Sequence, residues 1–125
     1  MVTKMFTKDD LIFSYSRAQA IEDGVLVDVT ETAKKAGFKC RVAATTAVWE
    51  KYVVVPDGVE GQDERGRLWD IVWMLRHAIK QSRELHFDLF VQNDNTRATL
   101  VKLKSVCVPS DDGSLCITIM LPRED

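Results

Sequence analysis

The C-terminal third of the chain alternates between apolar and polar positions, which is the pattern of strands that bury one face. Apolar or small side chains occupy every second position in residues 85–91, 101–107 and 115–121. The segments between them, residues 93–95 (NDN) and 109–113 (PSDDG), are rich in turn-forming residues. The pattern therefore predicts a three-strand antiparallel meander at the C-terminal end.

Matching the apolar rows of the last two strands predicts their register, with Cys107 opposite Leu115. A register that paired Cys107 with Cys116 would instead place two isoleucines of the last strand beside two lysines. We therefore expect the two cysteines on opposite faces of the sheet, where a disulfide between them is disfavoured.

The segment from Asp63 to Gln81 carries the strongest helical signal, because its apolar residues recur at steps of three and four. This predicts the longest helix of the protein, which we expect to lie across the apolar face of the meander. The glycine-rich stretch at residues 56–66 predicts a loop in front of it. The expected core stripe of the helix consists of Leu68, Ile71, Val72, Leu75, Ala78 and Ile79.

The N-terminal half is predicted to hold short elements with recognisable caps. Ser16 and Gln19 match a capping box, and Gly24 is placed to end that helix. We expect the strand at 25–29 to cover the exposed edge of the last meander strand. The predicted elements are a helix at 17–23, that strand, a helix at 31–36 capped by Thr30 and ended by Gly37, an extended segment at about 39–44, and a helix at 46–52 behind Thr45.

The chain has 125 residues, of which 46% are hydrophobic and 29% charged, a composition that fits one domain over residues 1–125. The expected fold class is α+β, with the meander packed against one long helix and with short N-terminal helices and a short strand. Charged residues interrupt the first twenty positions before a signal-peptide core could form, which favours a cytoplasmic location. No apolar run is long enough for a membrane span.

The charge balance gives no sign of a nucleic-acid partner. Seventeen basic and nineteen acidic residues leave a formal net charge of -2, so neither a basic arm nor a strongly acidic DNA mimic is indicated. The three cysteines, Cys40, Cys107 and Cys116, show no paired metal-ligand spacing. We expect free thiols, no metal and no cofactor.

No constellation of catalytic residues stands out. His77 and His86 both fall on polar faces of their predicted elements and are interpreted as solvated side chains. Asp23 and Asp28 flank a glycine and a strand, where catalytic carboxylates occur, but a helix end and the polar side of a strand explain them better. A protein without catalytic residues is therefore the favoured interpretation.

The aromatic residues of the long helix are more informative. Trp69 and Trp73 are one turn apart and lie roughly 100–140° round the helix from the core stripe, with Arg65 and Arg76 nearby. Tryptophan together with arginine is typical of protein-binding hot spots. The same residues also fit a second packing face within the domain, or the seam of a homodimer, and the sequence leaves these alternatives open.

Three blocks of the chain resemble a known family: FSYSRAQAIEDGVLVDV at 13–29, GQDERGRLWDIVWM at 61–74 and DDGSLCITIMLPRED at 111–125. They are similar to a family of small uncharacterised proteins encoded on bacterial plasmids, phages and other mobile elements. The resemblance implies a mobile-element accessory protein, and none of the three blocks is a catalytic motif. No catalytic residue is therefore carried over from the family.

Mobile elements often use small proteins to bind and inhibit host defence proteins, which is an analogy of context and not of chemistry. We accordingly expect a cytoplasmic protein that binds a protein partner stoichiometrically, as an inhibitor of the anti-CRISPR or anti-restriction type. Tyr15 and Arg17 also fit a simpler role as anchors of the N-terminal helix. The candidate partner-binding residues are Arg65, Trp69, Trp73, Arg76, Tyr15 and Arg17.

Two other classes of function stay open from the sequence alone. A small enzyme with a carboxylate-based site would need Asp23, Asp28, Arg17 or His77 to converge in a pocket. A nucleic-acid-binding regulator would need its basic side chains on one face, for which the candidates are Arg97, Lys102 and Lys104.

Overall fold

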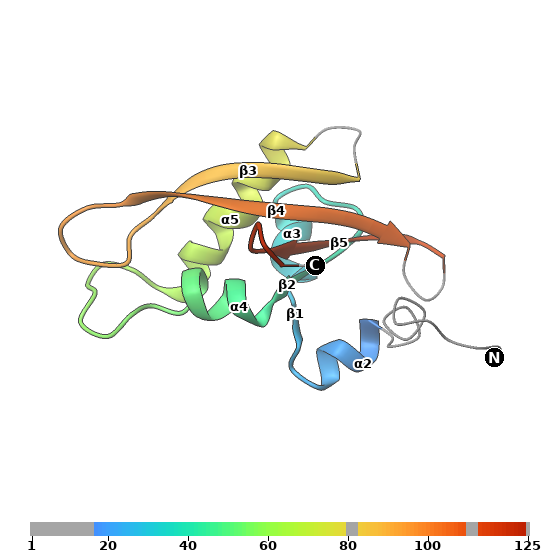
Figure 1. The fold of residues 1–125 in the computed structure, drawn as a ribbon, viewed down its shortest axis with the longest axis horizontal. Helices are drawn as coiled ribbons and strands as arrows, with labels where there is room; N and C mark the ends of the chain where they lie inside the picture. Colours follow the sequence, from blue (N-terminus) through green and yellow to red (C-terminus); the bar gives the residue numbers. More distant parts are fainter. Residues whose placement is uncertain (1–16, 80–82, 110–112, 125) are drawn as a thin grey trace.

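The alternating segments form one mixed sheet of five strands in the computed structural model, which describes residues 17–79, 83–109 and 113–124 (Figure 1). The strand order across the sheet is β1-β2-β5-β4-β3. The strands are β1 (Leu26–Asp28), β2 (Arg41–Thr45), β3 (Glu84–Val91), β4 (Thr99–Pro109) and β5 (Leu115–Met120). The helices are α2 (Arg17–Glu22), α3 (Thr30–Lys35), α4 (Thr46–Val48), the π-helix η1 (Trp49–Val53) and α5 (Glu64–Ala78).

The predicted meander is confirmed as β3, β4 and β5, which pair antiparallel in sequence order. The predicted register was wrong by two residues, because Cys107 lies opposite Ile117 and Leu115 lies opposite Pro109. The ladder between β4 and β5 is longer than predicted, and the connection between the two strands is correspondingly shorter. A shift of two keeps every side chain on its predicted face, so Cys116, opposite Val108, still faces away from the side of Cys107.

The expected neighbour of β5 was also wrong. Strand β5 pairs in parallel with β2, and β1 pairs antiparallel with the other edge of β2. An inner strand must bury both of its faces, and β2 does so with Val42, Ala43 and Ala44, each at most 1% exposed. Strand β1 has three residues and ends on the exposed Asp28, which suits an edge.

The long helix is confirmed, and it covers the inner face of the sheet together with α3. It packs against β3, α3 and η1, and Figure 1 shows α5 and α3 behind the strands. Ile71, Val72 and Leu75 of its apolar stripe are at most 1% exposed. The predicted stripe continued too far, because the helix ends at Ala78 and Ile79 is extended and exposed.

Local hydrogen bonds explain where the short helices begin. The Thr45 hydroxyl accepts from the backbone N–H of Val48 at 3.3 Å, as expected of an N-cap. Thr30, by contrast, is the first residue of α3 and not its cap. The Asp28 carboxylate accepts from the backbone N–H of Thr30 at 3.0 Å and from its hydroxyl at 2.6 Å. The acceptor that precedes α3 is therefore an aspartate of β1.

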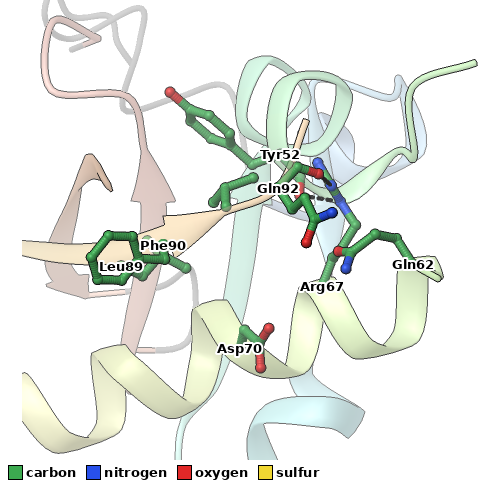
Figure 2. Close-up of a pocket in the computed structure, with 8 residues that line it drawn as sticks. Tyr52, Gln62, Arg67, Asp70, Leu89, Phe90 and Gln92 are labelled. Carbon is green, nitrogen blue, oxygen red and sulfur yellow. Dashed lines mark hydrogen bonds between the residues drawn. The ribbon is translucent and has the colours of Figure 1, made fainter. Parts of the chain in front are cut away.

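A buried arginine fixes α5 against two other segments, and Figure 2 shows its guanidinium beside Tyr52 and Gln92. Arg67 is 4% exposed. Its Nε donates to the Tyr52 carbonyl at 2.8 Å, its Nη1 to the Gln92 carbonyl at 2.6 Å, and its Nη2 to the Asn93 side-chain oxygen at 2.6 Å. Burial lowers the pKa of Arg67, but a guanidinium keeps its proton in proteins. One cation thus joins η1, α5 and the connection after β3.

The connection between β3 and β4 also holds the loop in front of α5. The Asn95 amide nitrogen donates to the Gly58 carbonyl at 2.7 Å, and its oxygen accepts from the backbone N–H of Glu60 at 2.8 Å. The Asp63 carboxylate then caps α5 by accepting from the backbone N–H of Gly66 at 2.6 Å. The predicted loop at 56–66 is therefore largely confirmed, although its last residues belong to α5.

Replacing Leu75 with alanine should lower the free energy of unfolding by roughly 2–5 kcal/mol, because the side chain is fully buried beneath the sheet. Lys102→Ala removes only an exposed ion pair with Asp88 and should cost below about 1 kcal/mol. Urea unfolding of both variants checks this. Equal losses would show that α5 does not pack through this stripe.

Replacing Arg67 with methionine should lower the free energy of unfolding by about 3 kcal/mol or more, since three oxygens lose a charged donor. Arg65→Met is the matched control, because Arg65 lies on the same helix and is exposed. The control should change stability by less than about 0.5 kcal/mol. Similar stability of the two variants in thermal and urea unfolding would contradict the role assigned to Arg67.

Candidate protein-binding surface

Two tryptophans and a histidine contact one another along one side of α5, at successive four-residue steps. The Trp69 and Trp73 ring centroids are 5.4 Å apart with an interplanar angle of 21°, and the Trp73 and His77 centroids are 4.2 Å apart. Trp69 is partly buried against the core, whereas Trp73 is 42% exposed. The two predicted partner-binding tryptophans therefore differ in their surroundings. Trp69 packs against the core and contacts Trp73, whereas the Trp73 side chain is exposed to solvent.

An apolar groove lies where this helix meets strand β3. Its volume is about 370 Å³. Of the seven large hydrophobic residues that are exposed in the described part of the chain, four line this groove. Such a concentration of exposed apolar surface is characteristic of an interaction site. The lining residues are Asp70, Trp73 and Met74 of α5, Asp88, Leu89 and Phe90 of β3, and Leu100 of β4.

The two carboxylates of the groove differ in their surroundings. Asp88 forms an ion pair with Lys102, with Oδ1 and Nζ 3.2 Å apart. Asp70 forms no ion pair with any residue that the structure describes, and Figure 2 shows it projecting from α5 on the side of β3. Although Asp70 is exposed, partial desolvation by its neighbours raises the pKa of its carboxyl above the ordinary value. A charged carboxylate at this point is therefore a cost to the folded chain.

The predicted arginines occupy other parts of the surface. Arg65 and Arg76 are both exposed on α5. Arg76 lies over Gly37 at the end of α3, where an added Cβ would come within 3.1 Å of its Nε. Gly37 also has a φ of +107°, which favours glycine. Arg76 thus flanks the side of α5 that faces α3, whereas Trp73 reaches the groove beside β3.

Arg17 is tied to the sheet. Its Nη1 donates to the Thr118 hydroxyl at 2.8 Å, and its Nη2 to the Ile117 carbonyl at 2.6 Å. These contacts fit the interpretation of Arg17 as an anchor of helix α2. Tyr15 and the Ser16 cap lie outside the described residues.

The groups needed by the enzyme alternative have separate structural partners. Asp23 accepts from the Gln19 side chain at 3.0 Å, and Asp28 holds the start of α3. The His77 Nδ1 lies 2.9 Å from the Trp73 carbonyl and, as the only possible donor of the pair, carries a proton there. Burial, with a smaller contribution from the thiols of Cys107 and Cys116, raises the pKa of Cys40 and so disfavours its thiolate.

The basic residues of the nucleic-acid alternative are largely engaged as well. Lys104 is buried, and its Nζ donates to the Glu124 carbonyl. Lys102 is paired with Asp88, which leaves Arg97 as an exposed cation beside the Asp94 turn. The described residues contain no group of three or more His, Cys, Asp or Glu side chains placed to hold a metal ion.

Of the seven groove residues, only Trp73 was identified from the sequence as part of a binding site. The other six are Asp70, Met74, Asp88, Leu89, Phe90 and Leu100. Phe90 and Leu100 carried a usable signal, because both are apolar at positions that the alternation assigns to the outer face of the sheet. They lie opposite each other in the β3–β4 ladder and are 67% and 56% exposed. Asp70 and Met74 carried none, since polar and apolar residues both occur on the exposed side of a helix.

Replacing Asp70 with asparagine should raise the free energy of unfolding at neutral pH. Between the ordinary aspartate pKa and the raised one, the folded protein holds more protons than the unfolded chain, so stability falls as pH rises through that window. Asp70→Asn has no carboxyl group there and does not lose stability in this window. The difference in the free energy of unfolding between the two proteins should therefore disappear below the ordinary aspartate pKa. Urea unfolding of both proteins across acid to neutral pH checks this. A less stable variant at neutral pH would mean that Asp70 makes a stabilising contact.

No helix among the described residues combines the length and the apolar character that crossing a membrane requires.

Comparison with known proteins places the chain by family. No curated protein and no solved structure matches the chain. A family model described as a family of unknown function (DUF6573) matches residues 2–125. The chain therefore belongs to the DUF6573 family.

Proposed function

We propose that this protein acts without catalysis, by stoichiometric binding of a protein partner in the groove between α5 and β3. The observation that carries the proposal is the clustering of Trp73, Met74, Phe90 and Leu100, all exposed, around one groove. Burying such apolar side chains against a partner is the main favourable term in most protein association. Tryptophan is also among the residues most enriched at binding hot spots.

Two contacts favour a groove that is ordered before a partner binds. Trp69 holds the ring of Trp73 from below, and Arg67 ties the start of α5 to the chain that leaves β3. A surface that is already ordered loses little conformational freedom when it binds. The four groups that the enzyme alternative would need to converge, Arg17, Asp23, Asp28 and His77, are engaged in separate structural contacts.

The resemblance to mobile-element proteins extends the proposal to the kind of partner. The accessory proteins of plasmids and phages meet host nucleases and defence effectors, and binding alone is enough to inhibit such a target. We therefore favour a host defence protein as the partner, with the present protein as an inhibitor of the anti-restriction or anti-CRISPR type. This extension rests on context, whereas the binding groove rests on geometry.

Replacing Trp73 with alanine should weaken partner binding by about 2 kcal/mol or more, as truncation of a hot-spot residue does. The fold should lose only about 1 kcal/mol, mainly from the stacking with Trp69. Affinity capture from a bacterial host with the tagged parent protein and variants, together with their thermal unfolding, measures both effects.

Leu115→Ala is the matched control, because Leu115 is 58% exposed and does not line the groove. The parent and this control should retain the same partner, and Trp73→Ala should lose it. Retention by all three proteins would refute binding in the groove. A loss of about 3–5 kcal/mol of stability in Trp73→Ala would mean that the residue is core.

A further inference from the structure

The sheet ends on β3 at the side of the groove. β3 pairs with β4 along one edge, and no strand of the described residues pairs with its other edge. This edge extends over Glu84–Val91. An uncovered edge strand presents backbone N–H and C=O groups that can pair with another extended chain.

The groove follows this free edge. Successive residues of a strand point to opposite faces of the sheet, yet Asp88, Leu89 and Phe90 all line the groove. Residues that point to opposite faces can line one groove only where the groove passes along the edge of the strand. A chain lying in the groove therefore lies beside the backbone of β3, with Trp73 and Met74 of α5 on its other side.

The charge of the groove restricts the side chains of such a chain. Asp88 is neutralised by Lys102, so Asp70 carries the charge that is left without an ion pair among the described residues. Asp70 and Met74 are four residues apart on α5, which is about 6 Å along the helix axis. This is close to the roughly 6.8 Å between residues i and i+2 of an extended chain.

We propose that the groove binds an extended segment of the partner protein, which adds as a strand to the free edge of β3. The segment carries an apolar side chain beside Met74, between Trp73 and Phe90, and, two positions away, a lysine or arginine that pairs with Asp70. Backbone pairing with β3 would supply affinity, and the two side chains would supply selectivity. This inference rests on the proposed function and specifies its partner.

A second copy of the chain fits the groove less well. In a dimer with paired edges, each β3 would receive the sequence ELHFDLFV, which contains no lysine or arginine to pair with Asp70. Glu84 and Asp88 of the incoming strand would add negative charge near the carboxylate. The charge of the groove therefore selects a basic segment of another protein.

Selection of binders from a library of random linear peptides against the full chain tests the inference. The enriched peptides should share an apolar residue and a lysine or arginine two positions apart. Binding should slow hydrogen exchange of the β3 amides. Asp70→Asn and Trp73→Ala should each weaken binding at least tenfold, whereas the matched surface variant Leu115→Ala should leave it unchanged.

Methylation of alternate peptide nitrogens separates strand addition from other modes of binding. One set of alternate N–H groups faces β3 and the other faces away, so one methylated set should abolish binding and the other should preserve it. Equal effects of both sets, enrichment of peptides without a basic residue, or failure to enrich any peptide would overturn the inference.

Two outcomes separate this inference from the proposed function. A partner that is captured through Trp73 but leaves exchange at β3 unchanged would refute strand addition and leave groove binding intact. The absence of any partner that depends on Trp73 would refute both. Sedimentation showing a dimer that Trp73→Ala dissolves would overturn the basic-segment inference and assign the groove to a second copy.

Discussion

A single buried cation joins the start of α5 to the end of β3. The guanidinium of Arg67 donates to the Tyr52 and Gln92 carbonyls and to the Asn93 side chain, so that η1, α5 and the end of β3 meet at one group. All of these acceptors are uncharged oxygens. A buried cation of this kind holds only while each acceptor remains in place. The Arg67 contacts and the buried apolar stripe of α5 together set the spacing between α5 and β3.

That spacing determines which side chains can face a partner. Within the described residues, α5 covers the inner side of β3 but leaves its free edge open, with Trp73 and Phe90 exposed beside it. The fold gains little from these features, since exposed apolar side chains, an unpaired strand edge and the carboxylate of Asp70 all carry a cost. Residues that weaken a fold and cluster in one place are expected where binding takes place.

Much of the fold could be predicted from the sequence, because one buried face imposes a repeat of two on strands and of about 3.6 on helices. The meander and the stripe of Leu68, Ile71 and Leu75 on α5 follow from that rule. The position of β2 beside β5 could not be predicted, since parallel pairing leaves no turn sequence between the partners. The contacts of Arg67 were equally hidden, because an arginine in a helix is usually exposed. Of the candidate site itself, only Trp73 could be predicted from the sequence. The residues contributed by β3 and β4 come beside α5 only through the pairing of strands.

Photo-crosslinking from position 90 tests most directly whether the groove beside β3 holds the partner. The photoreactive amino acid benzoylphenylalanine, in place of Phe90 in one protein and of Leu115 in another, reports contact at two similarly exposed sites. Binding in the groove predicts a covalent adduct with a host protein from position 90 and none from position 115. An adduct from position 115 alone would contradict the account, because it would place the partner away from the groove.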